Sequence, residues 1–367
     1  MIYLDNAATT PICESAKQAI LEYLDNYGNP SSSYEFARES RLLIENARER
    51  IAKCINAEPN EIYFTSGGSE SDTWALKGRR SLASNIEHHA IRATKLFYVE
   101  PHTGLVHPEY LNDVILGNRA FNNVPIEIVS CMAVNNEIGT IMPITSLAEV
   151  SHENGVLFHT DAVQAVGHLP MDVKKVGCDM LSASAHKWGG IKGCGFLYVK
   201  KGVKFTPLIY GGKQEQNMRA GTENVLGIIS MAAALEDAIE HINERHYHIK
   251  LLRDKMLNEL SAIEGVYLNG VGVLDNRVVS NLNFRIDGVP GQRLVALCDL
   301  HGICISSGSA CNEGESRPSH VLKAIGLTDR DALNSIRITI GYQNTIEEID
   351  YAANIIKKLI KMIRDDA

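Results

Sequence analysis

The amino-acid sequence predicts an α/β protein, with a larger domain built on a mainly parallel sheet covered by helices and a smaller α+β domain after it. Two observations carry this prediction. Between Glu61 and Lys200, short apolar runs alternate with helical patterns, as they do in strand–helix–strand proteins. Beyond about Ile263, alternating strand patterns mix with amphipathic helices. No internal repeat or low-complexity tract interrupts either part.

The strands of the larger domain are predicted from runs rich in β-branched and aromatic residues. These runs are apolar throughout and do not alternate, which indicates strands buried on both faces of a parallel sheet. They occupy residues 61–65, 95–99, 126–134, 156–160, 179–182 and 195–199.

A long helical pattern follows, from Asn224 to about Ile263, with one glycine and no proline. We expect it to connect the two parts of the molecule. In the smaller domain, the patterns predict strands over 278–286 and 335–340, and helices over 291–301 and 346–363.

Composition and charge exclude several classes of function. Of the 367 residues, 45% are hydrophobic and 22% are charged, as in ordinary globular proteins. The formal net charge is −8, and no block of Lys and Arg forms a nucleic-acid footprint. The first residues lack a basic region followed by an apolar run, and no apolar stretch is long enough to span a bilayer. We therefore expect a cytoplasmic protein that binds neither nucleic acid nor membranes.

The eight cysteines are scattered along a chain without an export signal or a C-x-x-C pair, so we expect no disulfide framework. Most are expected to be small buried hydrophobes, as Cys298 is within an apolar run. Cys311 differs, because it lies in a stretch of small and polar residues (306–318) that is typical of a loop. It is the best candidate for an exposed, reactive thiol.

The first motif that carries chemistry is FTSGGSES at residues 64–71, where an apolar strand runs into two glycines, hydroxyl residues and a helix. Backbone N–H groups at a helix N-terminus, joined by Ser hydroxyls, make an anion cradle that glycine lets a phosphate approach. A Ser-rich helix cap is an equally good interpretation of the octet by itself. The motif lacks the Lys-Ser/Thr ending of a nucleotide-binding P-loop.

Two further motifs follow predicted strands. Asp161, in HTDAVQ, is placed where open α/β sheets bind ligands and is suited to hold a protonated ring nitrogen, although it could simply cap the next helix. Lys187, between His186 and Trp188, is poorly explained as a solvated charge. A partly desolvated lysine forms Schiff bases with carbonyls. A phosphate cradle, a strand-end Asp and a strand-end Lys are the three groups that pyridoxal 5′-phosphate requires.

With these residues in place, the sequence resembles the cysteine desulfurases of the class V aminotransferase family, which have the pyridoxal-phosphate fold type I. The resemblance covers essentially the whole chain. Its matching segments are YLDNAATTP (3–11), GNPSS (28–32), FTSGGSES (64–71), EH (87–88), NNEIGT (135–140), HTDAVQAVG (159–167), SASAHK (182–187), GTEN (221–224), SSGSAC (306–311), PSHVLKAIGL (318–327) and SIRITIG (335–341).

The resemblance implies a large cofactor-binding domain over 13–245, with a sheet of the seven-stranded type. It implies a small domain made of 1–12 and 246–367 that carries the loop with the catalytic cysteine. A homodimer with shared active sites is implied as well, because the phosphate would also be held by Thr222 of the other subunit.

The resemblance also assigns roles around the cofactor. Lys187 would hold pyridoxal phosphate as a Schiff base, Asp161 would pair with the pyridine nitrogen, and Gln164 would reach the phenolic oxygen. His88 would stack on the ring and take part in catalysis; the register of the motif favours it over His89. The phosphate would be bound by Gly68, Ser69, Ser184 and His186.

Substrate binding and sulfur transfer are implied in the same way. Asn136 and Arg337 would hold the carboxylate of L-cysteine, the latter as a bidentate fork. From the residues alone, Arg337 could instead occupy a solvated strand face, because it alternates with isoleucines. Cys311 would take the sulfur as a persulfide and hand it to an acceptor protein, a scaffold or sulfur carrier, for iron–sulfur cluster assembly or other sulfur delivery. We expect no resident metal, although Cys311 is a candidate contact for a cluster in transit.

Several positions depart from the family pattern without removing a catalytic group, namely Tyr34, Gly189, Ile191, Lys213, Asn217 and Tyr342. They leave the subtype open. The alternatives are a selenocysteine lyase or another class V aminotransferase-type enzyme, and a catalytically idle sulfur-assembly subunit. The sequence does not identify the sulfur acceptor, the pathway, or the balance between cysteine and selenocysteine.

Overall fold

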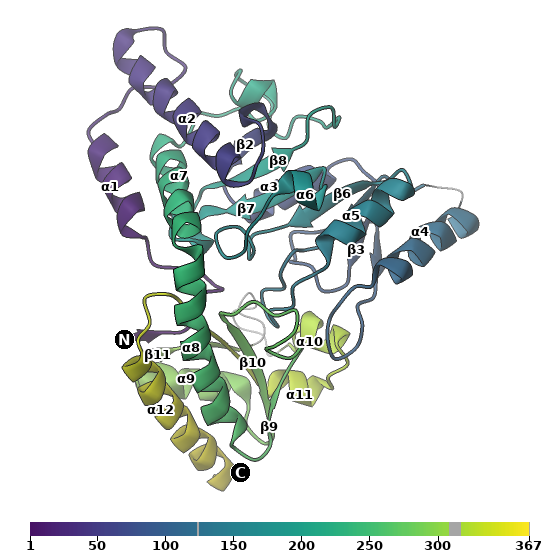
Figure 1. Ribbon diagram of the computed structural model, residues 1–367, viewed down its shortest axis with the longest axis vertical. Coiled ribbons are helices and arrows are strands. Elements are labelled where there is room, and N and C mark those ends of the chain that lie inside the picture. The colour runs from purple at the N-terminus through teal and green to yellow at the C-terminus, as the bar shows by residue number, and fades with distance from the viewer. Residues whose placement is uncertain (123–124, 308–316, 367) are drawn as a thin grey trace.

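The computed structural model describes residues 1–122, 125–307 and 317–366. The described chain forms two parts, each built around a sheet of its own and joined by a column of helices (Figure 1). This arrangement confirms the predicted α/β class.

The sheet of the larger part has seven strands in the order β2-β8-β7-β6-β5-β3-β4. Strand β8 is antiparallel to both of its neighbours, and all other neighbouring strands are parallel. The inner strands β5, β7 and β8 are buried at every residue, as their apolar runs predicted. The strands are β2 (Ile62–Thr65), β3 (Ser81–Ser84), β4 (Lys95–Phe97), β5 (Ile128–Ser130), β6 (Leu157–Asp161), β7 (Met180–Ser184) and β8 (Gly195–Val199).

Helices cover this sheet. The most apolar of them, α7, packs against α1 and α2 and joins the same hydrophobic core as the sheet. The helices of this part are α1 (Glu14–Tyr23), α2 (Glu35–Cys54), α3 (Gly68–Leu76), α4 (Pro108–Asn122), α5 (Ile144–Glu153), α6 (Val173–Val176) and α7 (Val225–Glu240), with the short 3₁₀ turns η1 (Pro59–Glu61), η2 (Ala185–Lys187) and η3 (Glu215–Asn217).

The connection between the two parts consists of two helices, although the sequence predicted one. Helix α7 ends at Glu240, the ψ angle of 12° at His241 leaves the helical range, and α8 (Ile242–Ser261) starts directly after His241. Polar and charged residues begin at this point, while α7 is nearly all apolar. The two helices still form one column between the parts (Figure 1).

The smaller part has an antiparallel sheet in the order β12-β13-β10-β9 and a separate hydrophobic core. Helix α12 lays an apolar face on this core and begins with a capping box between Thr345 and Glu348. The elements are β9 (Val266–Leu268), β10 (Asn281–Ile286), β12 (Ser306–Ser307), β13 (Ser335–Thr339), α9 (Gly291–Leu300), α10 (His320–Ala324), α11 (Asp329–Leu333) and α12 (Ile346–Asp365).

The start of the chain belongs to both parts. Strand β1 (Ile2–Tyr3) pairs in parallel with β11 (Ile303–Cys304) of the smaller part. Residues 4–10, which we call the N-terminal strap, then cross to the larger part, where Thr10 N donates to the carbonyl of His186 at 2.9 Å. The strap therefore passes between the two sheets.

None of the helices in the described ranges is both long and apolar enough to cross a membrane. The seven cysteines described by the structure are all free thiols. Cys54 and Cys304 are partly exposed, and the other five are buried, as small hydrophobes are expected to be.

Candidate active site

A cavity of about 400 Å³ brings together most of the residues that the sequence motifs singled out. Of the predicted site residues that the structure describes, all but Thr222 line it. These residues are Gly68, Ser69, His88, Asn136, Asp161, Gln164, Ser184, His186, Lys187 and Arg337.

The floor of the cavity is the turn between β2 and α3. Gly67 has a φ angle of 147°, which favours glycine, and an added Cβ at Gly68 would lie 2.7 Å from the side chain of Val163. No side chain caps α3, so the interpretation of the octet as a Ser-rich cap is wrong. The first N–H groups of the helix have no intrahelical acceptor, and Ser184 lies beside them. The turn is therefore built to hold an anion.

Lys187 follows β7 in the η2 turn and reaches the N-terminal strap. Its Nζ donates to the carbonyls of Ala7 and Ala8 at 2.6 and 2.7 Å. On the other side, the ring of His168 bonds to the carbonyl of Lys187 at 2.8 Å, which fixes the backbone of the turn. The amine thus lies inside the cavity, where sequence analysis expected it.

Asp161 ends β6, and its side chain is buried at the cavity wall. Burial raises the pKa of this carboxyl group, while His88 and Lys187 lower it. One oxygen accepts the N–H of Val163 at 2.9 Å, so the local turn uses part of the carboxylate. Residues 163–168 form turns, and the next helix, α6, is capped by Asp172, so the interpretation of Asp161 as a helix cap is wrong. The turn and a ligand contact are compatible, since a carboxylate has two oxygens.

Two further carboxyl groups, which sequence analysis assigned no role, are buried near Asp161. Asp72 and Glu87 each keep one oxygen without a hydrogen-bond partner among the described residues. Burial raises the pKa of Glu87 to about 8 and that of Asp72 well above its usual value. Unpartnered buried polar atoms at a cavity are typical of a site built for a polar ligand. Asp72 directly follows the phosphate-cradle motif, which is the signal that could have found it.

Replacing Glu87 by glutamine should flatten the pH dependence of stability. The folded state holds the Glu87 proton up to about pH 8, whereas the usual value is 4.5. Wild-type stability should therefore fall as pH rises between those values, by a few kcal/mol in order of magnitude, and Glu87→Gln should remove that fall. Urea unfolding of cofactor-depleted protein at several pH values measures it. If the free energy of unfolding depends on pH in the same way in both proteins, Glu87 titrates normally in the folded state.

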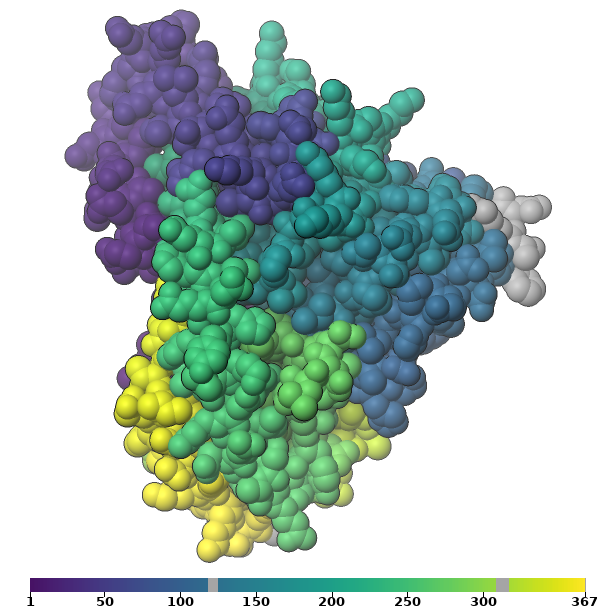
Figure 2. All heavy atoms as spheres, in the orientation of Figure 1, coloured from purple at the N-terminus to yellow at the C-terminus, as the bar shows by residue number. Residues whose placement is uncertain are grey.

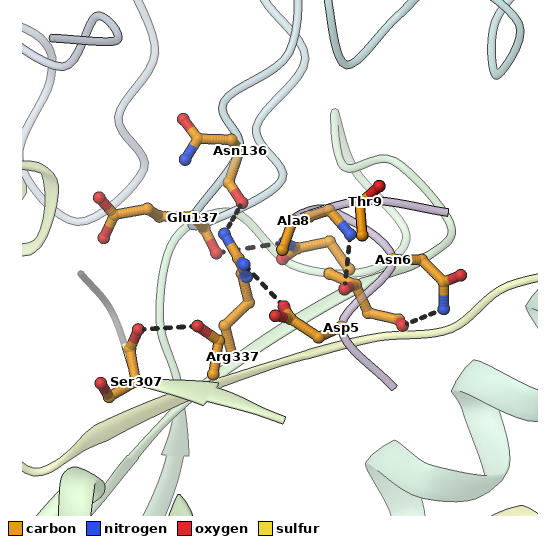
Figure 3. Close-up of polar contacts among 12 residues, drawn as sticks. Asp5, Asn6, Ala8, Thr9, Asn136, Glu137, Ser307 and Arg337 are labelled. Atoms are coloured by element: carbon orange, nitrogen blue, oxygen red, sulfur yellow. Dashed lines mark hydrogen bonds and ion pairs between the residues drawn. The ribbon is translucent and has the colours of Figure 1, made fainter. Parts of the chain in front are cut away.

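Arg337 lies in the middle of β13, and its side chain is only 5% exposed, so the solvated-face interpretation is wrong. Figure 3 shows its guanidinium group between Asn136 and Asp5. Nη1 donates to the carbonyl of Asn136 at 3.0 Å, and Nη2 lies 2.7 Å from an oxygen of Asp5. The Nε donor is buried without a partner in the described part of the chain.

The remaining lining residues surround these charges. His88 accepts the N–H of Ala90 at 3.1 Å, and burial lowers the pKa of its ring, which favours the neutral form. His89 is exposed and packs against His320, with ring centroids 4.6 Å apart and the ring planes tilted by 40°. Gln164 donates its amide to the carbonyl of Ala7 at 3.0 Å.

Two predicted residues remain to be placed. Thr222 is exposed and does not line the cavity. Cys311 lies outside the described residues. Among the departures from the family pattern, Gly189 has a φ angle of 99° and packs against Cys13, and Tyr342 lies under the guanidinium of Arg245. Neither lines this cavity.

Comparison with known proteins finds one matching family and several similar proteins. The family model described as aminotransferase class-V matches residues 2–352. The chain is 41% identical to "Cysteine desulfurase IscS" of Methanosarcina thermophila, over 99% of this chain and 93% of that protein. It also resembles the solved structure of a NifS-like protein from Rickettsia africae, with a TM-score of 0.90 and 31% identity over 98% and 99% of the two chains. A structure titled "SspA in complex with cysteine" matches with a TM-score of 0.79 and 29% identity, over 94% and 100%.

Proposed function

The chain belongs to the aminotransferase class-V family, and from that premise we infer that it is a cysteine desulfurase. It converts L-cysteine to L-alanine and passes the sulfur on. The observation that carries this conclusion is the composition of the cavity lining. Lys187 follows β7, Asp161 ends β6 and Arg337 lies within β13, and all three line the same cavity. Incubating the purified protein with L-cysteine and measuring alanine tests it.

The cavity fits pyridoxal 5′-phosphate as the cofactor. The turn at Gly68 and Ser69, with Ser184 and His186, supplies donors for the phosphate, and Lys187 supplies the amine for the carbonyl. Asp161 supplies the negative charge that a protonated pyridine nitrogen needs. Gln164 and His88 complete the surroundings of the ring. When bound, the cofactor supplies the electron sink for bond breaking at the amino acid.

The residues of the chain have separate tasks. Arg337 and Asn136 bind and orient the carboxylate of the substrate. The amine of Lys187 would take the proton from the substrate's α-carbon. Neutral His88 is suited to stack and to exchange protons beside it, because burial lowers its pKa.

Sulfur leaves the substrate by transfer to Cys311. The Cys311 thiolate attacks the substrate sulfur, a sulfur–sulfur bond forms, and the carbon–sulfur bond breaks. The electron pair of that bond returns to carbon, which takes up a proton, so that L-cysteine becomes L-alanine and Cys311 becomes a persulfide. The persulfide is then delivered to a sulfur-acceptor protein, for iron–sulfur cluster assembly or another use.

We propose that the enzyme works in the cytoplasm as a homodimer, divided into domains over 13–245 and over 1–12 with 246–367. The α1–α2 region projects from the upper left of the molecule (Figure 2) and carries exposed large apolar side chains, which supports a subunit contact there. The exposed apolar side chains of the α1–α2 region are Leu21, Leu24, Tyr27, Tyr34, Phe36 and Leu42. Thr222 is exposed as well and is available to the phosphate site of a neighbouring subunit.

Replacing Asp161 should slow turnover at least about a hundredfold, the scale on which removing one preorganised charge acts. Asp161→Asn keeps the acceptor for Val163 N and removes the charge, whereas Asp161→Ala removes both. Both variants should still bind cofactor through its phosphate, because that cradle is separate. Cofactor content and alanine formation are the measurements. Near-normal turnover in either variant would mean that the ring nitrogen has another partner.

A selenocysteine lyase is the second candidate, because it would share the whole described cavity. It differs in not depending on Cys311. Comparing alanine formation from cysteine and from selenocysteine, in wild type and in a Cys311 variant, separates the two.

A further inference from the structure

The guanidinium of Arg337 is held by two groups that come from distant parts of the chain. Asp5 binds Nη2 at 2.7 Å and Asn136 binds Nη1 through its carbonyl at 3.0 Å, so the group cannot rotate without losing one of them. The Nε–H remains buried and unpartnered among the described residues. It lies next to Nη2 on the edge of the guanidinium that carboxylates bind in bidentate fashion.

The position of Asp5 is itself fixed by β13. Asp5 bridges in parallel to Thr339, two residues beyond Arg337 on the same strand. On either side of Asp5, Thr339 N donates to the Leu4 carbonyl at 2.7 Å and the Thr339 hydroxyl accepts Ala7 N at 2.9 Å. The Tyr3 hydroxyl donates to the carbonyl of Asp5 at 3.0 Å. The backbone on both sides of Asp5 is hydrogen-bonded to β13, and this holds the Asp5 carboxylate next to Arg337 of the same strand.

Arg337 needs such a hold because other carboxyl groups surround the cavity. Glu137 is buried beside it, bonded to the hydroxyl of Ser319, and attracts the guanidinium. A long arginine side chain has many rotamers, and a competing acid can draw it away from the substrate. The Asp5 carboxylate on Nη2 removes that freedom.

We propose that Asp5 is a positioning residue for Arg337: it holds the guanidinium in the lining of the cavity, in the orientation that binds the carboxylate of the incoming amino acid. This inference rests on the proposed function, in which Arg337 binds the substrate carboxylate. The same strap binds Lys187 through the Ala7 and Ala8 carbonyls, so its backbone aligns the carboxylate fork with the amine.

The test compares Asp5→Ala with Asp5→Asn in the cofactor-loaded enzyme. Asn keeps an oxygen that can accept from Nη2, so its KM for L-cysteine should stay within about threefold of wild type. Ala has no side-chain oxygen that could hold the guanidinium of Arg337, so KM for L-cysteine should rise about tenfold or more while kcat changes less. The dissociation constant of the product L-alanine, from equilibrium titration, should rise in parallel.

A matched control is Asp237→Ala, which breaks an Arg–Asp pair with Arg245 of similar burial outside the cavity lining. It should lower the thermal midpoint without changing KM. If Asp5→Ala lowers only the midpoint, Asp5 is merely structural and the proposal is wrong. A lower KM would also overturn it, because Asp5 would then compete with the substrate.

The failure of this inference can be told apart from failure of the proposed function. If Arg337 binds the substrate carboxylate, Arg337→Ala should raise both the KM for L-cysteine and the dissociation constant of L-alanine. An unchanged Arg337→Ala, or a wild type that makes no alanine, would contradict the proposed function. A strong effect of Arg337→Ala with none of Asp5→Ala would contradict the role of Asp5 alone.

Discussion

Lys187→Ala should lose the visible absorption of bound pyridoxal phosphate and its turnover together. Lys187 is the lysine that lines the cavity, and its Nζ already points to the strap carbonyls there. Without this amine no Schiff base joins cofactor and chain, and no base of matching position takes the substrate's α-proton. We expect a loss of activity of roughly a thousandfold or more. Phosphate contacts should retain part of the cofactor non-covalently.

Lys192→Ala is the matched control, because Lys192 is exposed, lies five residues later and does not line the cavity. It should keep both spectrum and activity. Borohydride reduction followed by peptide mapping should place the fixed cofactor on Lys187 in wild type. A Lys187→Ala protein that is active and carries a reducible cofactor bond would contradict the assignment.

Cys311→Ser should stop the release of alanine and sulfide from L-cysteine while cofactor binding stays intact. The serine hydroxyl has about the size of the thiol, yet it stays protonated at neutral pH, whereas a free thiol has a pKa of about 8.5. The nucleophile is removed and the groups that line the cavity are untouched. The variant should still change its absorption when cysteine is added, because the earlier steps do not use the thiol.

The control for this variant is Cys304→Ser. Cys304 lies in β11, and burial raises the pKa of its thiol, which disfavours the reactive thiolate. Its replacement should leave turnover nearly unchanged. If Cys311→Ser releases sulfide at the wild-type rate, transfer through a persulfide does not occur here and the lyase alternative takes its place.

Local sequence patterns predicted most of the fold because buried strands are apolar runs with clear ends. The strand β3 was missed, since SLAS has small and polar residues that imitate a loop, although all four are buried. The break at His241 was missed as well, because no proline or glycine marks it. There the change from an apolar to a polar helix was the only signal.

The candidate site was predictable where one motif holds both the strand end and the functional side chain, as at Asp161 and Lys187. It was not predictable where partners are remote in sequence. Asp5 and Arg337 are 332 residues apart, and nothing local reveals that they form an ion pair. The burial of Arg337 depends in the same way on the strap that covers it, so its alternation with isoleucines gave the wrong alternative.

The most direct test of the central claim is mass spectrometry of the wild-type protein after brief exposure to L-cysteine. The peptide that contains Cys311 should carry one added sulfur, removable by a thiol reductant, while the peptide region around Cys304 should not. Alanine should appear in the same incubation. Alanine formed while Cys311 stays unmodified would contradict sulfur transfer to this cysteine, and an incubation that forms no alanine would contradict the desulfurase itself.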